Sequence, residues 1–249
     1  MSTDSAWEEW GRRDPYFGVI TNEKFRLSEL TAEAKLEFFE SGRVHAEYVL
    51  QMIRQYIDPH FHPQSILDFG CGVGRLVVPF AGLAREVVGL DVSSSMLLET
   101  KRNCEELGIS NIRLVVSDDA LSAVTGKFDL IHSYIVFQHI PPERGIEIFR
   151  NLLGLLQSGG VGAVHFAYSK TVYAGTDGVP PKQTPSPFAR RAVPAPEADP
   201  EMQMNPYSMT EILFLMQMAG IHRFHTEFSD HGGELGVFLF FQKPVASAV

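Results

Sequence analysis

Short apolar runs alternate along this chain with longer stretches of helical spacing. The apolar runs predict strands near residues 65–70, 86–91, 112–116, 128–134 and 160–168. The stretches between them predict helices over residues 74–84, 94–107 and 142–157. Strands that alternate with helices form a parallel sheet that is covered on both faces. The pattern therefore predicts a doubly wound α/β fold.

The C-terminal part of the chain shows a different pattern. A helix is predicted near residues 208–219, and two apolar segments follow it at 222–228 and 235–242. Only a short connection with Gly232 and Gly233 separates these segments. Two strands joined so closely form a hairpin, so we expect one antiparallel strand near the end of the sheet.

Two segments lie outside this strand–helix alternation. Residues 1–64 begin with aromatic side chains, for which we expect partly looped structure, and continue as helices, one of them over 42–53. Residues 169–206 hold eight prolines without a helix or strand pattern, and so long a connection is either functional or disordered. We expect one domain over residues 1–249. Its parts are an N-terminal extension at 1–64, a core at 65–168, an insertion at 169–206 and a C-terminal helix and hairpin at 207–249.

The strongest chemical signal follows the first predicted strand, where Asp68 precedes glycines at 70, 72 and 74. Glycine permits positive φ and lets a ligand approach the backbone closely. The pattern differs from the dinucleotide motif G-x-G-x-x-G, because Arg75 stands where that motif has its third glycine. Asp68 would also repel a pyrophosphate. The turn therefore favours a cationic nucleoside ligand over NAD or ATP.

A second acid, Asp91, ends the next predicted strand about 20 residues further on. In nucleotide-binding α/β folds an acid at this position hydrogen-bonds the ribose, and a carboxylate can accept from two hydroxyls at once. Asp91 could instead cap the following helix. Ser93, Ser94 or Ser95 can serve as that cap, so we favour the ribose role.

These motifs resemble those of the class I S-adenosylmethionine-dependent methyltransferases. The resemblance covers about residues 43–168 and includes Asp68–Gly74, Gly89–Met96, Ile112–Ala120, Phe128–Ile140 and Leu152–Gly160. It implies a Rossmann-like, seven-stranded, mostly parallel sheet with one antiparallel strand near the C-terminus. It also implies S-adenosylmethionine as cofactor and S-adenosylhomocysteine as product. It says little about the identity of the acceptor. In the resembled fold the connection at 169–206 lies over the edge of the sheet where ligands bind, so we expect this insertion to cover the acceptor site.

The resemblance also implies roles for individual residues. Those expected at the methionine end of the cofactor are Asp68, the backbone of Gly70, Cys71 and Gly72, and Ser133. Those expected at the ribose and adenine are Asp91, Val92, Met96, Asp118 and Asp119, with the backbone of Ala120 as an alternative to that of Asp119. In similar enzymes an N-terminal helical segment closes over the cofactor, and Arg43 could then pair with its carboxylate. Simpler interpretations stay open. Ser133 could be only a strand-end serine, Met96 a core methionine, Asp119 a helix cap and Arg43 part of a surface ion pair.

Composition narrows the classes of partner. The net charge is −9 and the sequence pI is about 5.5, which argues against nucleic-acid binding and favours a small-molecule or protein acceptor. Only Cys71 and Cys104 are present, which excludes a disulfide framework and fits a reducing cytoplasm. Neither a signal region nor a membrane span is apparent. We expect a cytoplasmic protein without membrane partners, either a monomer or a homodimer.

Methyl transfer requires a positioned nucleophile and, for a hydroxyl, a general base. His139 follows the fourth predicted strand and is the best candidate, although a histidine there could simply bond the backbone at the strand–helix junction. His132 and His165 lie inside strands and should be packed. We expect no metal. Aromatic and methionine side chains of the outer segments would suit an apolar or aromatic acceptor: Trp10, Tyr16, Phe17, Phe188, Met202 and Met204.

The predicted function is methyl transfer from S-adenosylmethionine to an oxygen or nitrogen of a small molecule. Two alternatives use the same fold, namely a protein that binds this cofactor without methylating and a methyltransferase that acts on proteins. A nicotinamide oxidoreductase is a weaker third possibility.

Overall fold

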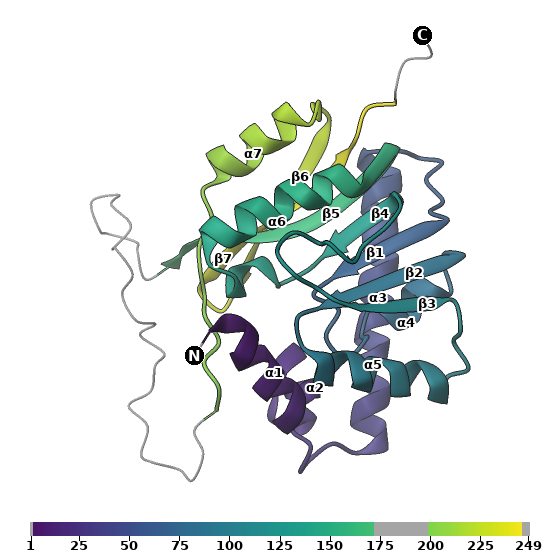
Figure 1. Cartoon of the computed structure of the whole chain (residues 1–249), viewed down its shortest axis with the longest axis vertical. Helices are drawn as coiled ribbons and strands as arrows, with labels where there is room; N and C mark the ends of the chain where they lie inside the picture. Colours follow the sequence, from purple (N-terminus) through teal and green to yellow (C-terminus); the bar gives the residue numbers. More distant parts are fainter. Residues whose placement is uncertain (1, 172–198, 246–249) are drawn as a thin grey trace.

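The computed structural model describes residues 2–171 and 199–245 and contains one seven-stranded sheet (Figure 1). The strand order is β3-β2-β1-β4-β5-β7-β6. The strands are β1 (Ser65–Phe69), β2 (Glu86–Asp91), β3 (Ile112–Val116), β4 (Phe128–Ser133), β5 (Leu156–Lys170), β6 (Phe224–His231) and β7 (Glu234–Gln242). Strand β7 runs antiparallel to both β5 and β6, which confirms the predicted seven-stranded sheet with one antiparallel strand.

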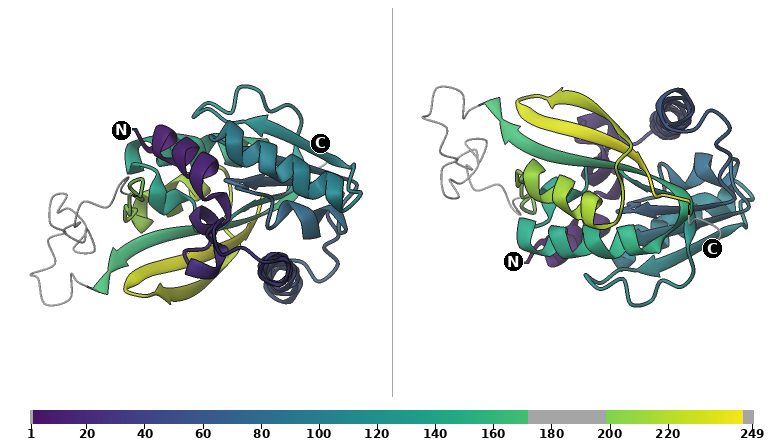
Figure 2. Two further views of the ribbon diagram at one scale, coloured as in Figure 1. Left: turned by 90° about the horizontal axis from the view of Figure 1, so that it is seen from below. Right: turned by 90° about the horizontal axis from the view of Figure 1, so that it is seen from above.

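Helices cover both faces of the sheet, as the alternating pattern predicts (Figures 1 and 2). One face packs against α3 (Ala32–Tyr56), α4 (Val77–Ala81) and α5 (Ser94–Glu106), and the other against α6 (Pro142–Leu155) and α7 (Met209–Met218). Neighbouring strand residues enter different cores, since Ile66 lies in the α3 and α4 cluster and Leu67 in the α6 and α7 cluster. Burial on both faces is why these strands are continuous apolar runs.

The N-terminal segment is more helical than the sequence predicts. It forms α1 (Thr3–Arg13), α2 (Pro15–Val19) and a 3-10 turn η1 (Glu23–Phe25) before α3. Ser2 caps α1 by accepting a hydrogen bond from Ser5 N, and a proline starts α2, so local signals support both helices. The expected looped start is therefore wrong. Trp10 and Tyr16 are buried where this segment packs on the domain.

The ends of two helices differ from the prediction for local reasons. Gly74 has a φ of +86°, which a right-handed helix cannot contain, so α4 covers only Val77–Ala81 of the predicted 74–84. At the C-terminal end of α6, Leu156 already has extended backbone, and β5 begins there instead of near residue 160.

The predicted insertion at 169–206 falls mainly outside the described residues, and Phe188 lies there too. Its described end passes close to a 3-10 turn, η2 (Phe137–His139), because Asn205 N donates to Gln138 O at 2.6 Å. Within residues 2–171 and 199–245, no helix has the length and apolar character needed to span a membrane.

Candidate functional site

The glycine turn lies between the ends of β1 and β2. Gly70, Gly72 and Gly74 have φ values of +75°, +55° and +86°, a region that favours glycine. Gly70 N and Cys71 N both donate to Leu90 O, at 2.8 and 2.9 Å, and Gly72 N donates to the carboxylate of Asp91. These amide donors are therefore used within the fold. The hydrogen-bond acceptors at the turn remain for a ligand, and they suit ammonium and hydroxyl groups.

Asp91 fixes the turn in place from the end of β2. Its Oδ2 accepts from Gly72 N at 2.8 Å, and its Oδ1 accepts from Ser93 N at 2.9 Å. Burial raises the pKa of the Asp91 carboxyl to about 6, the charge of Asp68 adds to this, and the amide hydrogen bonds oppose it. Each carboxylate oxygen retains a lone pair, so Asp91 can still accept from ribose hydroxyls.

Asp68 belongs to a hydrogen-bonded row with two histidines. Its Oδ1 lies 2.7 Å from Nδ1 of His132, and Nε2 of His132 lies 3.1 Å from Nε2 of His45 on α3. With Asp68 ionised, His132 donates from Nδ1 and accepts at Nε2, so His45 donates from Nε2 and its Nδ1 is left as an acceptor. Burial lowers the pKa of His45 to about 2, and His132 and Arg75 contribute, so this imidazole is neutral at pH 7.

The end of β4 returns to the glycine turn through a strained residue. Ile135 has a φ of +58°, which is unfavourable for a β-branched side chain, and such strain concentrates at functional sites. The next residue, Val136, lies against Gly70, where an added Cβ would come within 2.4 Å of Val136 Cγ2. Ser133 is fully buried, and its Oγ has no hydrogen-bond partner among the described residues. This hydroxyl is available to a ligand.

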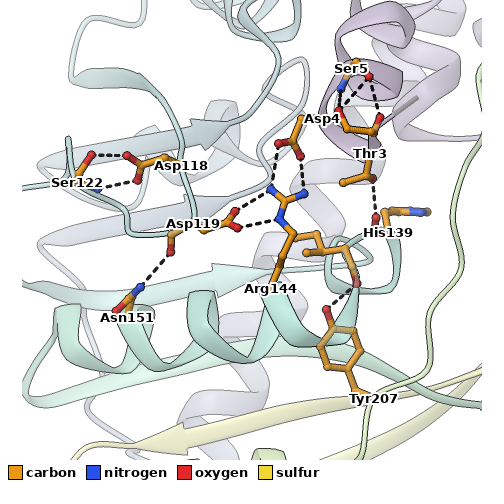
Figure 3. Close-up of polar contacts among 12 residues, drawn as sticks. Thr3, Asp4, Ser5, Asp118, Asp119, Ser122, His139, Arg144, Asn151 and Tyr207 are labelled. Carbon is orange, nitrogen blue, oxygen red and sulfur yellow. Dashed lines mark hydrogen bonds and ion pairs between the residues drawn. The ribbon is translucent and has the colours of Figure 1, made fainter.

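The acids at the end of β3 are already engaged within the protein (Figure 3). Asp118 accepts from Ser122 N at 2.8 Å and from the Ser122 hydroxyl, and hydrogen bonds to Ser122 lower the pKa of the Asp118 carboxyl. Asp119 makes a two-pronged ion pair with Arg144 at 2.7 Å. Asp118 can still accept from an adenine amine, whereas the carboxylate of Asp119 has a structural partner and does not cap a helix.

The N-terminal segment lies directly on the glycine turn. An added Cβ on Gly72 would lie 2.6 Å from Val19 Cγ2, and one on Gly18 would lie 3.2 Å from Met96 Cε. Met96 is buried in the cluster that this segment forms with α5, next to Trp10. Met96 is therefore packed as a core methionine, which was the alternative to a contact with adenine. Val92, which directly follows β2, is partly buried.

Glu8 attaches this segment to the N-terminus of α5. Its carboxylate accepts from the hydroxyls of Ser93 and Ser95, at 2.8 and 2.7 Å, and from Ser95 N at 3.2 Å. An acid at a helix N-terminus is stabilising because of the helix dipole. The role of Glu8 could not be predicted from the sequence, since nothing local to residues 3–13 indicates a contact with residues 93–95.

Arg43 does not extend toward the glycine turn. Its guanidinium bonds Glu40 and Glu47 on the same exposed side of α3, and its side chain is 50% exposed. Arg43 thus forms a surface ion pair, which was the alternative to pairing with the cofactor carboxylate. Arg75, which directly follows the glycine turn, is partly buried on this face, and its Nε is shielded and without a partner among the described residues.

His139 is buried beside the N-terminal segment. Its Nδ1–H donates to the carbonyl of Gln203 at 2.8 Å, and the edge of its ring meets Trp7 with centroids 4.9 Å apart. Burial lowers the pKa of His139 to about 4. His139 thus bonds the backbone near the strand–helix junction, as the alternative to a general base predicts. The neutral ring keeps Nε2 as an acceptor, with only a weak contact of 3.5 Å to the Gln138 amide.

Arg144 joins the N-terminal segment to the end of β3 (Figure 3). Its guanidinium binds both oxygens of Asp4 at 3.0 Å as well as Asp119. The hydroxyl of Thr3 donates to His139 O at 2.7 Å close by. These contacts hold the first turn of α1 against the domain.

We expect Arg144→Met to loosen α1 and to accelerate S-adenosylhomocysteine release several-fold, because two ion pairs are lost together. Hydrogen exchange of residues 3–13 and stopped-flow dissociation would measure both effects. Arg150→Met on the same helix is the matched control, since within residues 2–171 and 199–245 Arg150 pairs with Glu147 alone, on the surface. Equal exchange in the two variants would contradict the role of Arg144.

Comparison with known proteins agrees with this geometry. A family described as a methyltransferase domain matches residues 66–160. A ubiquinone biosynthesis O-methyltransferase of Thiobacillus denitrificans is 33% identical over 79 residues, which are 31% of this chain and 34% of that protein. An RNA methyltransferase of Thermosynechococcus vestitus is 33% identical over 82 residues, which are 33% of this chain and 18% of that protein. The chain thus spans about a third or less of the length of these two curated relatives.

Solved structures share the whole fold at low identity. Magnesium protoporphyrin IX methyltransferase from Synechocystis PCC 6803, solved with bound S-adenosylmethionine, has a TM-score of 0.62 at 15% identity and covers 98% of both chains. An N-methyltransferase from Bradyrhizobium japonicum WM9, solved with S-adenosylhomocysteine, has a TM-score of 0.59 at 15% identity and covers 98% of this chain and 100% of that one. Residues 66–160 thus match a methyltransferase domain, and the whole chain has the Rossmann-like fold of the S-adenosylmethionine-dependent methyltransferases.

Proposed function

We propose that this protein transfers a methyl group from S-adenosylmethionine to an oxygen or nitrogen of a small-molecule acceptor. The observation that carries the proposal is the hydrogen bond from Gly72 N to Asp91. It joins the glycine turn to the acid of β2 at the carboxyl edge of the sheet, where doubly wound folds bind their ligands.

The residues at this edge fit the cofactor. Asp68 keeps Oδ2 free of protein hydrogen bonds among the described residues and can accept from the ammonium group, while Asp91 can accept from ribose hydroxyls. The buried hydroxyl of Ser133 would gain a partner. When bound, the cofactor supplies an electrophilic methyl group on a sulfonium centre. The chain's own contribution is to orient the ligand, and Val19 above the turn helps to exclude water from it.

Charge favours a small acceptor over RNA. Some relatives are named as RNA methyltransferases and others as O-methyltransferases of ubiquinone biosynthesis, so relatedness alone does not choose between them. A net charge of −9 opposes an RNA backbone, because RNA-binding surfaces need compensating cations. A small molecule carries no such requirement.

Two measurements test the proposal. Calorimetry should show binding of S-adenosylmethionine and S-adenosylhomocysteine and much weaker binding of NAD. Mass spectrometry of reactions with a panel of hydroxylated and amino-substituted small molecules should then show S-adenosylhomocysteine formed only with an acceptor. Cofactor binding without product from small molecules, proteins or RNA would favour the non-methylating alternative, and tighter binding of NAD would reject the proposal.

His139 provides a test of catalysis that is separate from cofactor binding. We expect His139→Gln to reduce turnover by about 10²-fold or more if its Nε2 acts as general base. Affinity for S-adenosylhomocysteine should stay within a few-fold, because other residues hold the cofactor. Thermal denaturation of the same variant reports the structural role. A lower melting temperature with unchanged turnover would show that His139 only bonds the Gln203 backbone.

A further inference from the structure

A pocket of about 400 Å³ opens on the α3 face of the sheet, next to the glycine turn. Its lining includes His45, Tyr48, Arg75, Tyr134, His165 and Phe238. Arg75 directly follows Gly74, and Tyr134 directly follows Ser133. The pocket therefore adjoins the residues assigned to the methionine end of the cofactor, and only His45 of this lining is linked to them, through His132 and Asp68.

Arg75 is a cation without an ion-pair partner in this pocket. Its Nη1 reaches the Ser41 hydroxyl at 3.4 Å, its Nε is buried without a partner, and no carboxylate of the described residues lies within ion-pair distance. Burial lowers the pKa of the guanidinium, against the opposing charge of Asp68. A partly buried cation without an anion carries a desolvation cost that a bound anion would offset.

Packing fixes the position of this arginine. Gly42 of α3 lies against the Arg75 backbone so closely that an added Cβ would come within 2.0 Å of Arg75 O. The glycine thus lets the helix approach and places Ser41 beside the guanidinium. The planar donor fork of arginine matches a carboxylate, to which it can donate two parallel hydrogen bonds.

Aromatic rings make up most of the remaining lining, and none of them carries a positive charge at pH 7. Tyr134 lies 4.2 Å from His45 and 5.2 Å from Phe238 between ring centroids. Burial lowers the pKa of His45 to about 2 and that of His165 to about 3, so both imidazoles are neutral at pH 7. Glu227 lies on the β6 side, where it accepts from the Tyr48 hydroxyl. These walls would suit an aromatic ring, with an anionic group at Arg75 and a hydrogen-bond donor toward Glu227.

We propose that this pocket binds a methyl acceptor that is an aromatic carboxylate, with the carboxylate on Arg75 and the ring among His45, Tyr134 and Phe238. The inference rests on the proposed methyltransferase function and adds its substrate class. A carboxylate could also come from the methionine end of the cofactor, so the test must separate these two sources.

The probes are benzoate, 4-hydroxybenzoate, 3,4-dihydroxybenzoate and 2-aminobenzoate, each compared with its neutral amide. Binding is measured by calorimetry on the full chain saturated with S-adenosylhomocysteine. We expect at least one acid to bind at least tenfold more tightly than its amide, and Arg75→Met to remove that difference. The proposal is overturned if no acid binds, if acids and amides bind equally, or if Arg75→Met keeps the preference.

The source of the carboxylate is tested with the cofactor product itself. Arg75→Met should keep S-adenosylhomocysteine affinity within a few-fold, which also shows that the variant is folded. If Arg75 instead holds the cofactor carboxylate, this affinity falls tenfold or more, whereas 5′-methylthioadenosine, which lacks that carboxylate, binds as before. That result assigns Arg75 to the cofactor and overturns the acceptor proposal.

A second variant blocks the pocket without altering the arginine. Val44 lies at the pocket and is 53% exposed, so Val44→Trp should be tolerated by the fold. It should remove acid binding and preserve S-adenosylhomocysteine binding, and Val44→Ala should preserve both. Unchanged acid binding in Val44→Trp would overturn the location. A wild-type chain that fails to bind S-adenosylhomocysteine would instead reject the proposed function.

Discussion

Replacing Gly72 with valine is expected to abolish binding of S-adenosylhomocysteine. Gly72 has a φ of +55°, which a β-branched residue tolerates poorly. An added Cβ would also lie 2.6 Å from Val19 Cγ2, so a valine would force the N-terminal segment away from the turn. The peptide that donates to Asp91 would shift as well. Calorimetry should find no binding at ligand concentrations that saturate the wild type.

Gly108→Val is the matched control for this change. Gly108 also has a left-handed φ, of +68°, but an added Cβ there would meet nothing within 4 Å. Gly108→Val therefore carries a similar backbone penalty without a steric contact, and its affinity for S-adenosylhomocysteine should equal that of the wild type. If folded Gly72→Val binds within a few-fold of the wild type, the ligand does not lie on this turn.

The sheet could be predicted because its signals are local. Strands β1, β2 and β4 are mostly buried and β3 is partly buried, so each appears as an apolar run whose ends the sequence locates within about a residue. The N-terminal helices were harder to predict because their burial depends on distant partners. Gly11 packs against Ser93, and Trp10 packs with Phe17, so the contacts that bury α1 cannot be seen in its own pattern.

The residues of the candidate site also differ in whether local signals or distant contacts place them. The glycine turn and Asp91 could be found from spacing, because consecutive strands of a doubly wound sheet bring them together. The row from Asp68 to His45 depends on the register that pairs Asp68 with His132, and on how α3 crosses the sheet. The direction in which Arg43 points depends on helix rotation, which the apolar spacing of α3 defines only approximately.

Asp91→Ala should weaken S-adenosylhomocysteine binding by one to two orders of magnitude. A hydrogen bond to a charged group contributes about 1.5–3 kcal/mol, and the mutation also leaves Gly72 N and Ser93 N without their acceptor. Glu86→Ala is the matched control, because Glu86 begins the same strand at the opposite edge of the sheet and is exposed. Its affinity should be unchanged. Equal affinities for folded Asp91→Ala and the wild type would exclude Asp91 from the site.

The pH dependence of binding tests the same carboxylate without a mutation. The pKa of Asp91 in the free protein is raised to about 6 by burial first and by the charge of Asp68 second. Ribose hydroxyls donate best to the ionised form, so ligand binding should lower this pKa and release a proton. Affinity should therefore be constant above about pH 7 and should fall as the pH drops below 6. Asp91→Ala should lose this dependence, since the amino acid moiety and the adenine of the ligand do not titrate between pH 5 and 7. Calorimetry in buffers of different ionisation enthalpy would count the released proton, and an equal heat in all buffers at pH 5.5 would contradict the assignment.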